Sequence, residues 1–499
     1  MGDDAPLWLF GDQLGPHFHL SEATAHREVV LIESSRALGR RPAHRQKLHL
    51  LLSGMRHLAR ELGDRVTVLR APTYRQALRQ LGRPVVVHEP GSHAAADLVR
   101  SLQAEGAVQD VLPHPGFVRS RRSFEEWARG RRRFRMEDFY RDQRRVFGVL
   151  TERDGSPTGG RWNFDTENRE RPPKDQDRLG VPEPWTARED DVDEAVRADL
   201  DRMQQDGAVR SIGRDGPRIF PATAGEARSA LRRFLRYRLP EFGPYQDAVL
   251  DDDWAMAHAL LSVPMNLGLL DPLDVVRSAE RTYHRGRAHL SSVEGFVRQV
   301  LGWRDYVWHL YWHFGPQYTD HNALGAHAEL PAWWSQLRSE DVSAECLRVA
   351  LRGVRDRGWA HHIQRLMILG NHGLQRDYRP DQLTAWFANA FVDGFPWVMP
   401  ANVVGMSQHA DGGRVATKPY AAGGAYINRM SDHCRKCPYD PAQRTGDDAC
   451  PFTAGYWAWM SRHEHQLRDN PRMKQPLATM RKLPDIDDVR EQEARREVL

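Results

Sequence analysis

Hydrophobic residues in the first 120 positions occur in short runs that alternate with amphipathic stretches. Five runs are apolar without in–out alternation, and most are rich in valine: PLWLFGDQL, EVVLIESSR, RVTVLRAP, RPVVVHEP and VQDVLPHPGF. Strands buried on both faces have this composition, which is typical of a parallel sheet covered by helices on both sides. The pattern therefore predicts a doubly wound parallel-sheet α/β domain over residues 1–130.

The pattern changes twice after this domain. Residues 131–221 are largely polar and contain a stretch rich in Gly, Pro and Asp, which predicts a long interdomain linker. From residue 222 onward, apolar residues recur at helical spacing between short loops. We expect an all-helical C-terminal domain over residues 222–499, because 499 residues are too many for one core.

Composition adds little to the prediction of the fold, but it indicates which binding partners are possible. The net charge is +4, from 71 basic and 67 acidic residues, and only six of the basic residues are lysine. Residues 119–145 hold eleven Arg and five acids, which predicts either a solvated helix surface or a surface that contacts phosphates. No apolar run is long enough to span a membrane and no signal peptide is evident, so we expect a soluble cytoplasmic protein.

All four cysteines belong to one predicted metal site. Cys434 and Cys437 form a Cys-x-x-Cys pair, Cys450 follows, and Cys346 lies upstream. Four thiolates suit structural zinc or a [4Fe–4S] cluster, and spacing alone does not separate the two. Because Cys346 and Cys450 are isolated and zinc sites more often use two tight pairs, we favour the cluster over zinc or free thiols.

Two adjacent histidines lie in GWAHHIQRLMILGNHG, residues 358–373. On a helical period His362 shares an apolar stripe with Trp359 and Ile363, whereas His361 shares a face with Arg365. Taken alone, this pattern favours a hydrogen-bonded core histidine at 362 over a functional one.

Dense aromatic residues in GWRDYVWHLYWHF, residues 302–314, are typical of a core, but they could also wall a flat ring cofactor. Asp393 and Asn402, in FVDGFPWVMPANVVGMS, would provide a polar lining for such a ring.

Read together, LLSVPMNLGLL, RQVLGWRDY, WAHHIQRLMILGN and FVDGFPW…PANVVGMS resemble the flavin-pocket segments of the photolyase/cryptochrome family. The cysteine set, the linker and the opening LFGDQL are similar to its iron–sulfur bacterial branch, the prokaryotic (6-4) photolyases. The resemblance implies an α/β antenna domain, a long connection and an all-helical FAD-binding domain. It also implies a set of FAD-binding residues: Ser262, Asn266, Gln299, Trp303, Arg304, His361, Arg365, Asp393 and Asn402.

Two positions depart from the family pattern. Met406 replaces the first tryptophan of the usual electron-transfer chain, and Trp386 becomes our candidate for that role. Gln299 and Val300 stand where the family carries a glutamate that orients pyrimidine dimers, which favours a different photoproduct.

The resemblance implies light-driven repair of (6-4) photoproducts, with reduced FAD as the electron donor. His362 would deliver a proton, because imidazole titrates near neutral pH, and Tyr420 and Tyr426 would face the lesion. Leu366 replaces a second histidine found in animal homologues. The partner would be UV-damaged DNA with the lesion flipped into a pocket, bound by a monomer.

The crevice at the carboxyl ends of the strands is the predicted antenna site. Asp12, Gln13, Glu33 and Ser34 would hold 6,7-dimethyl-8-ribityllumazine, a chromophore that the resemblance suggests.

Three other functions fit the same sequence. A cryptochrome-like blue-light photoreceptor would use the same cofactors, and a cyclobutane pyrimidine dimer photolyase would use the same fold. A DNA-binding module with a structural iron–sulfur site would leave the flavin-like segments unexplained.

Overall fold

The computed structural model describes residues 5–131 and 133–496. Its N-terminal part contains a five-stranded sheet in the order β4-β2-β1-β5-β6, in which all neighbouring strands are parallel. The five strands are β1 (Leu7–Leu9), β2 (Val29–Ser34), β4 (Val66–Ala71), β5 (Val85–His88) and β6 (Val108–Leu112). Each lies within one of the five apolar runs, which confirms the predicted doubly wound fold.

The two faces of the sheet belong to different cores. Trp8 and Val30 pack against α4 (Tyr74–Leu81) and α5 (His93–Ala104) on one face. Leu7 and Leu9 point to the other face and pack with α3 (Arg45–Leu62). That second core continues into Phe234 and Phe296 of the C-terminal part. A continuous apolar core therefore joins the two parts of the chain.

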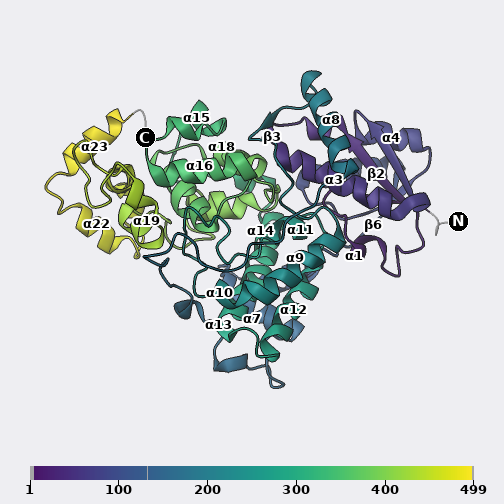
Figure 1. Ribbon diagram of the computed structural model, residues 1–499, viewed down its shortest axis with the longest axis horizontal. Coiled ribbons are helices and arrows are strands. Elements are labelled where there is room, and N and C mark those ends of the chain that lie inside the picture. The colour runs from purple at the N-terminus through teal and green to yellow at the C-terminus, as the bar shows by residue number, and fades with distance from the viewer. Residues whose placement is uncertain (1–4, 132, 497–499) are drawn as a thin grey trace.

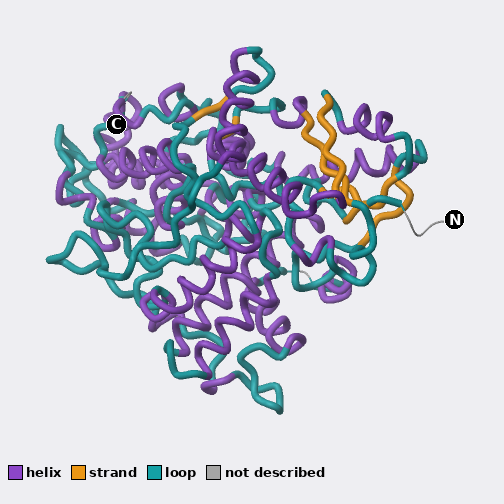
Figure 2. The backbone as a smooth tube through the Cα atoms, turned by 45° about the vertical axis from the view of Figure 1, so that its right-hand side comes forward, coloured by secondary structure: helices purple, strands orange, loops and turns teal. Residues whose placement is uncertain are grey.

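The C-terminal part is helical (Figure 1). Figure 2 shows that the strands are confined to the N-terminal side, apart from the short pair of β3 (Ala43–His44) and β7 (Ser211–Ile212). The helices that position the sites described below are α9 (Ala224–Tyr237), α12 (Pro272–His284), α13 (Leu290–Val297), α14 (Asp305–Phe314), α16 (Glu345–Arg357), α18 (Pro380–Ala390), α19 (Gly424–Met430), α20 (Pro451–Arg462) and α23 (Ile486–Arg495).

Residues 133–221, within the predicted linker, contain two longer helices. Within them α7 (Met136–Phe147) buries Phe139 and Tyr140 against the helical part, and α8 (Asp191–Gln205) packs on α3. A capping box between Asp190 and Asp193 starts α8. The connection is extended and irregular mainly between these two helices.

Five of the eleven arginines of residues 119–145 have strong partners within the protein. Arg144 is buried and donates to the backbone oxygens of Val149, Leu150 and Trp162. Four others form ion pairs with carboxylates, namely Arg119, Arg121, Arg122 and Arg141. These five serve the structure of the protein, whereas Arg129, Arg133 and Arg135 are exposed.

Among the described residues, no helix combines the length and the apolar character needed to cross a bilayer.

Candidate functional site

A cleft in the helical part contains most of the predicted cofactor residues. It has about 1140 Å³ of empty space, its open mouth included. Wide clefts with apolar walls and a few polar groups are the usual form of cofactor sites. The predicted residues on its wall are Ser262, Asn266, Gln299, Trp303, Arg304, His362, Arg365, Asp393 and Asn402.

Asp393 is the centre of a hydrogen-bond network in this cleft. Its carboxylate accepts from Arg365 Nη1 at 2.8 Å and from Ser262 Oγ at 2.8 Å. Its backbone oxygen accepts from Asn266 Nδ2 at 3.0 Å. Side chains from three distant segments are thus held together, and the predicted Arg365–Asp393 pair is present.

Arg304 forms the adjoining wall. Its guanidinium donates to the backbone oxygen of Gly116 at 2.8 Å and lies over the rings of Phe117 and Trp397. Burial lowers the pKa of Arg304 to about 10. The carbonyl and aromatic contacts keep this buried cation in a fixed position beside the cleft.

Three π-helical segments supply residues to the cleft. They are η4 (Arg298–Arg304), η7 (Gln364–Gly370) and η8 (Ala401–Ser407). Such segments are rare and occur often at functional sites. Leu260, just before Ser262, has φ of 56°, a left-handed conformation that costs energy for a non-glycine residue. Neither feature was predictable from the 3.6-residue period.

The position of His362 differs from the sequence-based expectation. Its side chain is 49% exposed and lines the cleft, so its assignment to the buried apolar stripe was wrong. Gly358, with φ of 59°, ends α16, and the helix that follows begins only at residue 362 before becoming π-helical. The segment therefore does not keep one helical period. His362 Nε2 pairs with Asp247 Oδ1 at 3.1 Å.

His361 is the histidine that behaves as a core residue. It is buried, and its Nε2 lies 2.7 Å from Nε2 of His258. Burial lowers the pKa of both histidines well below the usual value, so each is neutral near pH 7. His361 lies behind the wall rather than on it, whereas His258 lines the cleft.

Tyr420 and Tyr426 lie beside His362 but outside the lining of the cleft. Both are part of a small apolar cluster with Ile363, Leu366 and Met367. Burial raises the pKa of Tyr426 to about 12, with a further contribution from Asp247. The two tyrosines therefore pack against the segment that follows His362, and both keep their protons at neutral pH.

Trp386 is buried in α18 and is 5.1 Å from Trp334, measured between ring centroids. Trp333 lies 5.8 Å beyond Trp334. On its other side Trp386 contacts Phe391, whose ring lies under the Arg365 guanidinium. A line of aromatic rings thus runs from the Arg365 side of the cleft toward the partly exposed Trp333.

The four cysteines line a single second cavity, between α16, α19 and α20. Burial and the neighbouring thiols raise the pKa of Cys346 well above its usual value. The structure therefore brings all four predicted ligands to one cavity, and four thiolates suit either zinc or an iron–sulfur cluster.

The predicted antenna residues lie at the carboxyl ends of β1 and β2, and three of the four side chains have hydrogen-bond partners within the protein. Glu33 accepts from Arg56 through both carboxylate oxygens and also pairs with Arg70. Ser34 donates to the backbone oxygen of Pro72. Gln13 bonds the backbone of Phe10 and Glu89, and burial raises the pKa of Asp12 to about 6.

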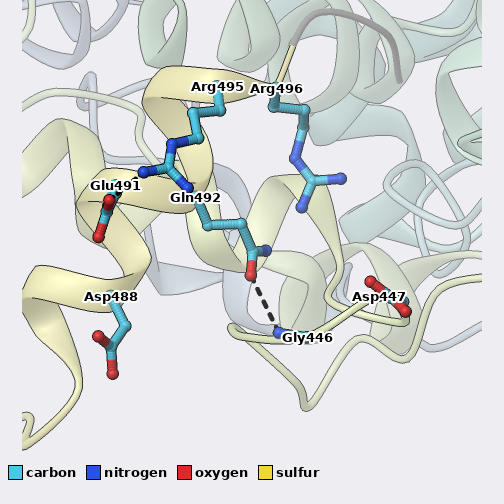
Figure 3. A pocket seen from close by; sticks show the side chains of 7 residues that line it. All are labelled: Gly446, Asp447, Asp488, Glu491, Gln492, Arg495 and Arg496. Carbon is cyan, nitrogen blue, oxygen red and sulfur yellow. Dashed lines mark hydrogen bonds and ion pairs between the residues drawn. The ribbon is translucent and has the colours of Figure 1, made fainter.

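A further hollow lies between α23 and the loop that precedes Cys450 (Figure 3). Gln492 accepts from the backbone N–H of Gly446 at 2.9 Å, and Arg496 lies over the ring of Tyr439. Side chains of both charges line this hollow, and it is separate from the cleft. These contacts attach the C-terminal helix to the loop that contains Cys437 and precedes Cys450.

Comparison with known proteins identifies the family. The "(6-4) photolyase" of Agrobacterium fabrum is 38% identical to this chain over 97% of it and 96% of the relative. The chain belongs to the photolyase family. The family "Deoxyribodipyrimidine photo-lyase-related protein" matches residues 7–210. Among solved structures, a bacterial class III photolyase from Agrobacterium tumefaciens covers 98% of the chain, with a TM-score of 0.59 and 16% identity. A Synechocystis cryptochrome covers 96%, with a TM-score of 0.56 and 14% identity.

Three residues of this photolyase-family site were missed by the sequence analysis. His258 and Asp247 contact the two histidines, and Lys47 reaches from α3 to the backbone oxygens of Ala388 and Gly394. A lysine on an amphipathic helix is ordinarily expected to face solvent, so the helical pattern around Lys47 gave no signal of its role. Only the packing of the two domains buries it near Asp393, where burial lowers its pKa to about 8.

Proposed function

We propose that this photolyase-family protein repairs (6-4) pyrimidine photoproducts in DNA by light-driven electron transfer from reduced FAD. The observation that carries the proposal is His362 on the wall of the Arg365–Asp393 cleft. The near full-length similarity to a (6-4) photolyase supports it.

FAD fits the cleft through the chemistry of its lining. Ser262 and Asn266 would lie near the phosphates and ribose, and Arg365 and Asp393 would flank the ring system. Gln299, Trp303, Arg304 and Asn402 complete the wall, with His361 behind it. When bound and reduced, FAD supplies the electron on excitation, and the protein orients it and excludes water.

The residues of this chain would control protons around the lesion. Repair of a (6-4) product must break the bond that joins the two pyrimidines and return a hydroxyl group from one ring to the other, and a proton must accompany the electron. His362 can deliver that proton at the mouth of the cleft, and Asp247 fixes the direction of its Nε2. Tyr420 and Tyr426 would lie beside the lesion, with their hydroxyl groups protonated.

We infer that the four cysteines hold a [4Fe–4S] cluster. An all-thiolate donor set that lines one cavity supports this assignment, and the isolated positions of Cys346 and Cys450 in the sequence favour it over zinc. A cluster bound by Cys346, Cys434, Cys437 and Cys450 would join α16 to the loop before α20.

We also propose a lumazine antenna, although most side chains at its site already form hydrogen bonds within the protein. Asp12, Gln13, Glu33 and Ser34 could hydrogen-bond a ring edge, but Glu33 would have to share its oxygens with Arg56. Mass spectrometry of the denatured protein, after expression in a host that makes lumazine, tests this assignment. Finding FAD alone would count against it.

Illumination of the reduced protein with defined oligonucleotides tests the main proposal. One oligonucleotide carries a (6-4) product, a second a cyclobutane dimer and a third no lesion. Light-dependent restoration of the (6-4) substrate alone is expected. Repair of the dimer alone would assign the alternative photolyase activity, and flavin photoreduction without repair would favour a cryptochrome-like photoreceptor. The monomeric state and the cytoplasmic location stay predictions, to be checked by light scattering and cell fractionation.

A further inference from the structure

A second hollow on the surface is lined by arginine. It lies between α9 and α12, which run next to each other in the lower part of Figure 1. The hollow is broad and open, with about 1910 Å³ of empty space that includes its mouth. Six arginines line it: Arg232, Arg233, Arg236, Arg281, Arg285 and Arg287. We call this surface the arginine groove.

The charge of the arginine groove is not neutralised within the protein. None of its six guanidinium groups lies within 4.0 Å of a carboxylate in the described part of the chain, and no carboxylate lines the groove. Five of the six arginines are exposed, and Arg233, which donates to the backbone oxygen of Glu183, is half-buried. Exposed arginines elsewhere are commonly paired, as Arg100 is with Asp97 and Arg202 with Asp199.

The spacing of these arginines suits a regular polyanion. Arg232 and Arg236 are one turn apart on α9, and Arg281 and Arg285 are one turn apart at the end of α12. Residues four apart are separated by about 6 Å along a helix axis, which is comparable with the spacing of phosphates along a nucleic-acid strand. Two such rows on neighbouring helices form an extended track rather than a single anion site.

One small hollow lies between the arginine groove and the cleft that contains Arg365 and Asp393. Trp185 lines both the groove and a small hollow beside it, and that hollow shares Ala259 and Leu260 with the cleft. Tyr237, an exposed aromatic residue, lies at the edge of the groove under Arg233 and Arg236. The groove therefore lies near the cleft, on the part of the protein that surrounds α9.

We propose that the arginine groove binds the phosphate backbone of duplex DNA that flanks the flipped lesion. A compact anion would engage only one or two of these arginines, whereas a duplex presents phosphates along the whole groove. The inference rests on DNA being the substrate. Its test uses undamaged DNA in the dark, so it can fail while light-driven repair holds, and it can hold if the lesion assignment fails.

The test compares variants of the full-length protein that carries its cofactors. The variant R232Q/R236Q/R281Q/R285Q removes four charges from the groove. The control R100Q/R202Q/R490Q/R495Q removes four arginines that are each paired within their own helix. A third variant places lysine at the four groove positions and so keeps the charge. Binding to an undamaged 30-base-pair duplex is measured by fluorescence anisotropy over a series of salt concentrations.

The groove variant should bind the duplex at least tenfold more weakly at low salt. Its plot of log affinity against log salt should become shallower by about 0.9 for each phosphate that the variant no longer neutralises. The control should stay within twofold of wild type, and the lysine variant should keep most of the salt dependence. A five-nucleotide lesion strand presents few phosphates outside the cleft, so its affinity should change less between the variants than that of the duplex.

Three results would overturn the proposal. The first is an unchanged duplex affinity and salt dependence in the groove variant. The second is a loss confined to structured RNA, and the third is a loss confined to inorganic pyrophosphate, which would assign the groove to a compact anion.

Discussion

His362 Nε2 lies 3.1 Å from the Asp247 carboxylate, while the neighbouring His361 is buried against His258. We expect His362→Asn to bind lesion DNA and retain FAD but lose (6-4) repair, because an amide cannot deliver a proton. General acid catalysis contributes about 10²- to 10⁴-fold, so repair per absorbed photon should fall by at least the lower value. Product analysis after illumination measures it.

Asp247→Asn should have a smaller effect than His362→Asn. It keeps a hydrogen-bond acceptor for His362 but removes the charge, so repair should fall by about tenfold and DNA binding should not change. Full repair by His362→Asn would contradict the assigned role and leave His362 as a surface histidine of the cleft.

The buried His258–His361 pair should make stability depend on pH. Burial lowers the pKa of both residues well below 6.5, so in the folded protein they stay neutral where the unfolded chain takes up protons. Stability is therefore complete above pH 6.5 and is lost as the pH falls below it, by up to about 1.4 kcal/mol per pH unit for each histidine.

Thermal unfolding of wild type and His361→Asn between pH 5 and 8 checks this prediction. The variant should show a weaker loss of stability in the acid range and a lower FAD content. If stability falls equally with pH in the two proteins, the His258–His361 pair is not the cause of the acid sensitivity.

The strands were predictable because each depends on a local pattern, and five apolar runs suffice to specify five buried strands. The cofactor residues instead came from the resemblance of four segments to a known family, and the structure places most of them around one cleft. The environment of His362 was not predictable, because Gly358 interrupts the helix and η7 changes its period. The helices α7 and α8 were not predicted either, because contacts with distant helices stabilise them.

Ser262→Ala and Asp393→Asn should differ in their effect on FAD retention. Ser262→Ala removes one hydrogen bond to Asp393, which is worth about 1 kcal/mol, or roughly fivefold in affinity. Asp393→Asn also leaves the Arg365 guanidinium without its charged partner, so the loss should be larger, at about 100-fold. Fluorescence titration of released FAD measures both, with Ser278→Ala on α12 as a control outside the cleft. Equal losses would show that the Arg365–Asp393 pair does not hold the flavin.

Replacing any one of the four cysteines by serine should remove iron and destabilise the fold, because a cluster that joins α16 to the α20 region contributes folding energy. Metal analysis and the visible absorption of the purified variants measure the loss. Ala458→Ser, at a buried position of α20 outside the cysteine cavity, is the control and should keep its iron. Stoichiometric zinc without iron in the wild-type protein would refute the cluster.

Trp386 and Trp334, with ring centroids 5.1 Å apart, should carry electrons to the flavin during photoreduction, since Met406 offers no redox-active ring. Trp386→Phe should slow photoreduction in the presence of an external thiol by an order of magnitude or more, and Trp334→Phe should also slow it. Trp459→Phe replaces an equally buried tryptophan in another cluster and should leave the rate unchanged. If Trp386→Phe photoreduces at the wild-type rate, the electron enters elsewhere. Trp397, which lines the cleft and lies 5.6 Å from Trp308, is then the next position to replace, because Trp308 and Trp312 continue that second line of rings.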